Sequence, residues 1–161
     1  MRILSLDVGT TESAYAIMDY TRENPLMEFG KIPNDEITML IGAVAPYPHE
    51  TVKLAYEEFA SYGMPIGKTT MKSIWWNGYF CRVSEEQGVD FFPVFRKDVK
   101  MHLCGTMKAK DTNIRQALID KYGAVGTKKN QGILYGVSKD VWSAIAINVT
   151  FHETQEKQDF I

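Results

Sequence analysis

The sequence predicts an α/β domain with a mixed five-stranded sheet, its first three strands antiparallel, and helices on both faces. Three β-branched and aromatic segments follow one another within residues 2–32, joined by turns too short for a crossover helix. Two later strand patterns alternate with longer helical patterns, which is typical of α/β proteins. With 161 residues the chain can bury a full core, so we expect one domain over 1–161.

The first half of the chain holds most of the predicted sheet. We expect strands in the segments RILSLDV (2–8), ESAYAIMDY (12–20), LMEFGKI (26–32) and TVKLAYEE (51–58). Between the last two, Pro33 and Asn34 open a helix over 35–45 that Pro46 and Pro48 end.

The second half is mainly helical. The predicted elements are a long helix at 67–88, a strand at 90–96, helices at 96–103 and 110–122, a loop at 123–137 and a last helix at 138–153. Pro93 lies inside the strand and cannot donate a ladder hydrogen bond, which favours an edge position or a bulge.

Composition excludes several classes of protein. The hydrophobic content of 45% is ordinary for a globular domain, and no run of eighteen apolar residues predicts a membrane span. The segment MRILSLDVG becomes acidic too early for a signal peptide. Cys81 and Cys104 are too few for a zinc site and fit free thiols in a reducing compartment. We therefore expect a cytoplasmic protein.

The charge is unevenly distributed along the chain. Residues 96–130 hold nine Lys and Arg but three acids, a local charge of +6, whereas the remaining residues carry −8. Such a zone is the electrostatic footprint of a polyanion site, or else a solvated helical face. Charge alone leaves both interpretations open.

Three acids stand at the ends of predicted elements. Asp7 follows a buried strand, Glu57 ends the strand at 51–58, and Asp140 lies in the first turn of the last helix. If the two strands are neighbours, Asp7 and Glu57 share one sheet edge, where the helix could add Asp140. An unpaired buried acid is costly, and oxygen ligands without Cys or His favour Mg²⁺ or Mn²⁺. Two such ions can drive phosphodiester hydrolysis.

These segments resemble the RuvC-type Holliday-junction resolvases of the ribonuclease H-like superfamily, specifically their phage and Gram-positive relatives. LSLDVGTTESAYAIMD is similar to the first family motif, VKLAYEEF to the second and KDVWSAIAINVTFH to the last. The order, spacing and length match across nearly the whole chain. The resemblance implies a ribonuclease H-like fold and a homodimer that nicks four-way and other branched DNA with two Mg²⁺ or Mn²⁺ ions per site.

Carried onto this sequence, the resemblance makes Asp7, Glu57 and Asp140 metal-binding catalytic carboxylates. The fourth family carboxylate falls on Ser143, which the i, i+3 spacing keeps on the helix face of Asp140. Either the second metal is bound more loosely here, or Ser143 is an inactivating change. A phage-encoded enzyme would work in the host cytoplasm.

Contacts with DNA are expected in two places, the basic zone and the loop after Glu57. Lys100 resembles a family lysine near the cut, and Lys110 a second one, although Asp111 lies nearer the expected position. The basic side chains that we expect to contact DNA phosphates are Lys97, Lys100, Lys108, Lys110 and Arg115. Phe59 and Tyr62, with Met64, are candidates for insertion near a branch point. The apolar helix around Trp75 and Val83 is expected to form the dimer interface.

Two other functions remain to be weighed. LDVGTT also resembles the phosphate-binding turn of sugar kinases and actin-like ATPases, whose second phosphate turn and Gly-Gly adenosine motif are missing here. The missing fourth acid also permits a catalytically weak or dead protein that binds branched DNA.

Overall fold

The fold is described by a computed structural model of residues 1–45 and 51–159, with side chains up to residue 155. Its elements are β1 (Arg2–Asp7), β2 (Glu12–Asp19), β3 (Leu26–Pro33), α1 (Asn34–Val44), β4 (Val52–Glu58), α2 (Lys68–Glu86), β5 (Asp90–Phe95), α3 (Arg96–Cys104), α4 (Asp111–Tyr122), β6 (Gly126–Thr127), β7 (Asn130–Gln131) and α5 (Lys139–Asp159).

The main sheet has five strands in the order β3-β2-β1-β4-β5. The pairs β1–β2 and β2–β3 are antiparallel, whereas β1–β4 and β4–β5 are parallel. The mixed sheet with three antiparallel first strands is therefore confirmed. Strand β5 lies at the edge, which explains how Pro93 is tolerated there.

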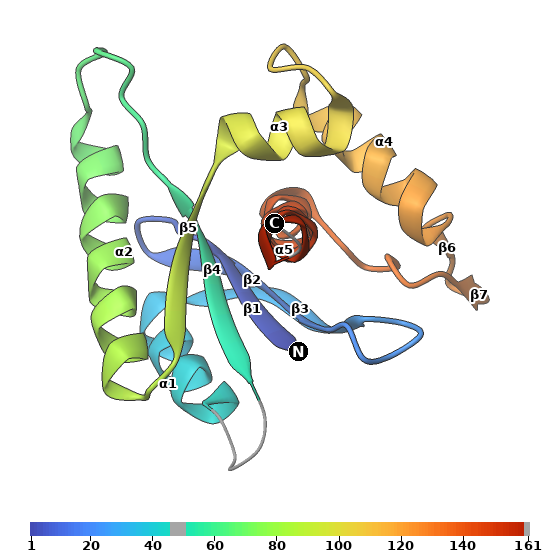
Figure 1. The fold of residues 1–161 in the computed structure, drawn as a ribbon, viewed down its shortest axis with the longest axis horizontal. Coiled ribbons are helices and arrows are strands. Elements are labelled where there is room, and N and C mark those ends of the chain that lie inside the picture. The colour runs from blue at the N-terminus through green and yellow to red at the C-terminus, as the bar shows by residue number, and fades with distance from the viewer. Residues whose placement is uncertain (46–50, 160–161) are drawn as a thin grey trace.

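Helices cover both faces of the sheet (Figure 1): α1 and α2 lie on one side, and α5 on the other, beside α3 and α4. Successive strand residues point to opposite faces, so β1 contributes to two cores. Leu4 and Leu6 pack with the α1 and α2 side, and Ile3 packs with the α5 side. Asp7 lies four residues after Ile3 in the same strand, so its side chain points to the same face of the sheet, the one that α5 covers.

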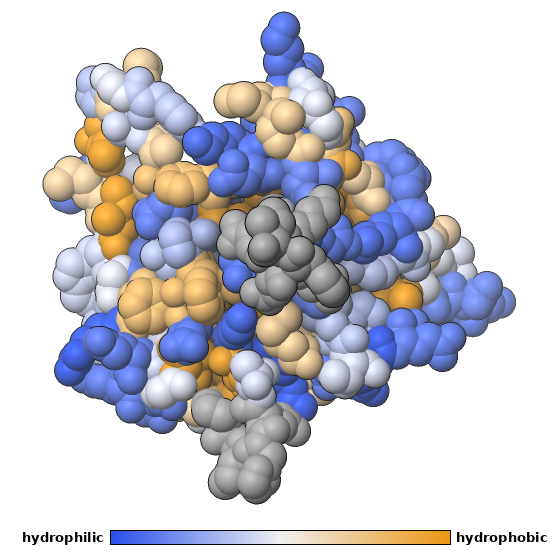
Figure 2. All heavy atoms as spheres, in the orientation of Figure 1, coloured by the Kyte–Doolittle hydropathy of each residue, from blue (hydrophilic) through white to orange (hydrophobic). Residues whose placement is uncertain are grey.

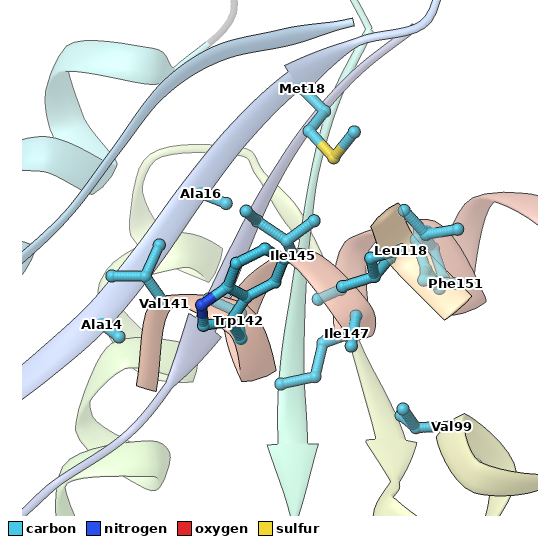
Figure 3. Packing of buried hydrophobic residues seen from close by; sticks show 14 of the residues in the cluster. Ala14, Ala16, Met18, Val99, Leu118, Val141, Trp142, Ile145, Ile147 and Phe151 are labelled. Carbon is cyan, nitrogen blue, oxygen red and sulfur yellow. The ribbon is translucent and has the colours of Figure 1, made fainter. Parts of the chain in front are cut away.

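Helix α5 is the central element of the second core. Val141, Trp142, Ile145, Ile147 and Phe151 are all buried and pack with the sheet and with α3 and α4 (Figure 3). This explains the near-continuous apolar run in the sequence of this helix.

Buried polar contacts fix α5 against β1. The Ser5 hydroxyl donates to the Ala144 carbonyl at 2.7 Å, and Asn148 Nδ2 donates to the Ile3 carbonyl at 2.9 Å and to Ser5 Oγ at 3.0 Å. Because buried polar groups are costly without partners, these bonds fix the rotation of α5 about its axis and its position along β1. They thereby set the positions of the residues in its first turns.

One part of the chain differs from the sequence-based expectation. The predicted loop at 123–137 contains a small hairpin, β6–β7, whose two-residue strands are too short to show periodicity. Helix α2 buries Phe80 and leaves Met71, Ile74, Trp75 and Tyr79 exposed. The upper left edge of the molecule in Figure 2 carries hydrophobic patches, and the lower left edge is hydrophilic. Helix α1 ends at Val44, and Pro46 and Pro48 lie outside the described residues.

None of the helices in the described part of the chain combines the length and the apolar character needed to cross a bilayer.

Candidate active site

The candidate acids of β1 and β4 lie in one row across the sheet. Asp7 is paired with Ala14 of β2, which is paired in turn with Lys31 of β3. On the other side Leu6 is paired with Tyr56, so Glu57 lies beside Asp7. Residues directly opposite one another point to the same face, here the α5 face. The small side chain of Ala14 leaves room there for the start of α5.

The turn after Asp7 is held by side chains of β2 and α1. Gly9 N–H donates to Ser13 Oγ at 3.2 Å, and Asn34 Nδ2 donates to the Gly9 carbonyl at 3.2 Å. A Cβ on Gly9 would lie 2.2 Å from the Glu12 carbonyl oxygen, so only glycine fits. Because the Gly9 N–H is already bonded to Ser13, it is not directed at a phosphate, which weighs against the kinase-like interpretation.

The surroundings of Asp7 disfavour the charged form of its carboxyl group. Its pKa is raised to about 7, mainly by burial and further by the negative charges of Glu57 and Asp140. Arg96 and a hydrogen bond with Ser143 oppose the rise without cancelling it. A bound cation would relieve this repulsion, and carboxylate oxygens are the ligands that hard divalent ions take.

Ser143 faces the same site. Its side chain is hydrogen-bonded to Asp7, as the i, i+3 spacing from Asp140 predicts. A neutral hydroxyl therefore occupies the place where the resemblance puts a fourth acid.

Glu57 has a cationic neighbour from the first turn of α3. Arg96 Nη1 lies 3.9 Å from Glu57 Oε2, and the same guanidinium forms an ion pair with Asp111 at the start of α4. Burial raises the pKa of Glu57, although Arg96 opposes this effect. Asn77 Nδ2 of α2 donates to the Glu57 carbonyl at 3.0 Å and fixes the end of the strand.

Asp140 is turned toward a lysine. Lys31 Nζ lies 2.6 Å from Asp140 Oδ2, and the two side chains are 44% and 47% exposed. Within the described residues, no three His, Cys, Asp or Glu side chains are close enough to hold one ion as they stand. The three acids offer the oxygen ligands that a hard cation takes, and Asp140 would have to leave Lys31 to join Asp7 and Glu57 around one ion. Neither the place of Lys31 nor the contact of Arg96 with Glu57 was predicted from the sequence.

Comparisons with known proteins point to one fold. No protein-family model matches the chain, and no curated protein sequence matches it. The structure of Thermus thermophilus RuvC aligns with a TM-score of 0.69 and 16% identity over 93% of this chain and 92% of that one. T. thermophilus RuvC in complex with a Holliday junction substrate aligns with a TM-score of 0.70 over the same shares and at the same identity. The chain has a RuvC-like fold.

Two grooves flank the acids of this RuvC-like fold, and Arg96 lines both. One, of about 360 Å³, includes Glu57 and four of the expected DNA contacts, Phe59, Tyr62, Lys97 and Lys100. The other, of about 470 Å³, includes Asp140, Ser143 and Arg115. Arg115 lies over the Trp142 ring at 4.9 Å. The sequence-predicted residues are therefore brought to both sides of the carboxylates.

The remaining basic candidates lie farther out on the RuvC-like domain. Lys108 lines a separate depression between α3 and α4, and Lys110 precedes α4, where its backbone N–H donates to Asn113 Oδ1 at 2.8 Å. The projection over α4 and the β6–β7 hairpin is strongly hydrophilic (Figure 2). Tyr62 is 70% exposed in the loop after β4, and Met64 is equally exposed.

Proposed function

We propose that the chain is a metal-dependent, structure-specific endonuclease that nicks four-way DNA junctions and other branched DNA. The observation that carries the proposal is the buried carboxyl of Asp7, whose charged form is disfavoured by Glu57 and Asp140, beside two grooves that these two acids and several basic side chains line. The RuvC-like fold supports it, because the solved relative was captured with a Holliday junction substrate.

Asp7, Glu57 and Asp140 are the residues that would hold Mg²⁺ or Mn²⁺, two ions per site. When bound, such ions supply activated water and stabilise the leaving oxygen in phosphodiester hydrolysis. The chain's own contribution is to bind and orient the DNA. Lys97 and Lys100 offer charge to phosphates beside Glu57, and Arg115 does so beside Asp140.

The assembly that we propose is a homodimer acting in the cytoplasm. A four-way junction is close to two-fold symmetric, so two sites related by a C2 axis can nick opposing strands. The exposed side chains of α2, Met71, Ile74, Trp75 and Tyr79, form an apolar surface that a second copy could bury. The motifs around Asp7 and Asp140 resemble those of phage and Gram-positive resolvases, which supports assigning the chain to that branch.

A branched-DNA-binding protein with weak or no activity is the second candidate. Two observations favour it: Ser143 stands where a fourth acid is expected, and Asp140 is paired with Lys31.

One assay separates the two functions. The chain is incubated with labelled four-way, three-way and duplex DNA, with Mg²⁺, Mn²⁺ or chelator. We expect nicking of branched DNA that needs the metal and is lost in Asp7→Asn, while junction binding persists in that variant. Binding without nicking under every metal condition would establish the second candidate, and absence of junction binding would refute both.

A further inference from the structure

Lys31 comes from the outer strand β3 and reaches the candidate site across the sheet. It shares the cross-strand row of Asp7, with Ala14 between them, and its side chain points to the same face. Its Nζ lies 2.6 Å from Asp140 Oδ2. The lysine therefore holds the one candidate metal ligand that α5 supplies.

The charges around Lys31 are negative. Asp140 is in direct contact, and Glu12 and Asp7 also act on the ammonium through space. Among the three candidate ligands, Asp140 is the one held at hydrogen-bond distance by a cation, since Arg96 stays 3.9 Å from Glu57. With Ser143 neutral, the acids left to a first divalent ion in the free protein are Asp7 and Glu57, whose two charges match that ion.

We propose that Lys31 is paired with Asp140 in the free protein and competes with a divalent metal ion for this carboxylate. The inference rests on the proposed metal-dependent function and deepens it. Lys31 acts as a positioning residue: in the free protein it keeps Asp140 away from Asp7 and Glu57, so metal occupancy at Asp140 requires that the pair opens. Because both side chains are almost half exposed, the ion pair is weak enough for an ion to displace.

The test measures Mn²⁺ binding to the free protein by calorimetry, without DNA. Lys31→Met keeps the length of the side chain and removes its charge, which frees Asp140 and removes a repulsive neighbour of the ion. We expect Mn²⁺ affinity to rise about five- to thirty-fold. Lys31→Arg keeps a cation at Asp140 and should bind Mn²⁺ like the wild type. Lys72→Met, on the exposed side of α2 across the sheet, is the matched control and should change nothing.

A second substitution assigns the gain to Asp140. In the double variant Lys31→Met, Asp140→Asn the gain should disappear, because the freed ligand is gone. Melting temperatures in chelator report whether each variant folds, and Lys31→Gln replaces Lys31→Met if the latter does not.

The outcomes separate this inference from the proposed function. Unchanged Mn²⁺ affinity in folded Lys31→Met or Lys31→Gln, with wild-type binding that still depends on Asp7, overturns the role of Lys31 alone. Failure of every variant to bind Mn²⁺, with or without a four-way junction, overturns the metal-dependent function itself.

Discussion

Replacing Ser143 by Asp should lower the stability of the metal-free protein and increase the stabilisation that metal provides. In the free protein the change removes the hydrogen bond between Ser143 and Asp7 and adds a like charge beside a carboxyl already raised in pKa to about 7. Hydrogen bonds to charged groups contribute about 1.5–3 kcal/mol. We therefore expect Ser143→Asp to lose about 2 kcal/mol of unfolding free energy in chelator, with part of the loss due to repulsion.

Thermal unfolding measures this loss directly. In a domain of this size 1 kcal/mol corresponds to about 2–4 °C, so the melting temperature in chelator should fall by about 4–8 °C. Excess Mg²⁺ or Mn²⁺ should raise the melting temperature of Ser143→Asp by more than that of the wild type, because a fourth carboxylate supplies a further ligand. A tenfold gain in metal affinity is worth about 1.4 kcal/mol, which adds about 3–6 °C to the metal-induced rise.

Ser143→Ala is the control for this pair of measurements. It loses the hydrogen bond without adding a charge, so its melting temperature in chelator should be lower than that of the wild type. Its metal-induced rise in melting temperature should not exceed the wild-type rise. The reasoning is refuted if Ser143→Asp melts like the wild type in chelator and shows no larger rise with metal, since Ser143 would then not face Asp7. Nicking supported by Mg²⁺ should also increase in Ser143→Asp, because Mg²⁺ demands a more regular ligand set than Mn²⁺.

Three further predictions concern pH, DNA and assembly. Asp7 has a pKa of 3.8 when unperturbed and about 7 in the folded protein, so the folded state binds the proton more tightly. The free energy of unfolding in chelator should therefore fall as the pH rises between these values. Asp7→Asn should lack this fall, and equal pH profiles of the two proteins would contradict the prediction. Lys100→Ala and Lys110→Ala should each weaken junction binding and lower the logarithmic salt slope by about one, whereas unchanged slopes would make the basic zone a solvated face. Trp75, 60% exposed on α2, should lie in the dimer interface, so Trp75→Glu should sediment as a monomer at micromolar concentration; a monomeric wild type would reject the interface.

Most elements of the fold could be predicted from periodicity and turn residues. The five strands of the main sheet and the five helices follow the sequence pattern. The signal is clearest in β1, β2 and β4, which bury most of their apolar positions. The neighbouring positions of Asp7 and Glu57 could also be predicted, because parallel strands end at one sheet edge. The β6–β7 hairpin could not, since two residues per strand give no period.

The position of Lys31 could not be read from the sequence either. Its place beside Asp140 depends on the register between β2 and β3, which shifts at an irregularity between Ile17 and Met18. A one-residue difference in pairing would send Lys31 to the opposite face. The approach of Arg96 to Glu57 likewise depends on how α3 turns away from β5, which is a tertiary property.

Helix α5 joins the hydrophobic core and the candidate site in one rigid piece. Hydrogen bonds of Asn148 with Ser5 and the Ile3 carbonyl hold α5 against β1. Asp140 and Ser143 lie in the first turns of the same helix. Heat or a core substitution that loosens this helix must therefore displace two candidate site residues at the same moment. We expect activity to disappear together with the cooperative unfolding of the domain rather than several degrees before it. A variant that gains thermal stability by better packing around Ile145 or Ile147 should extend the working temperature of the site by the same interval.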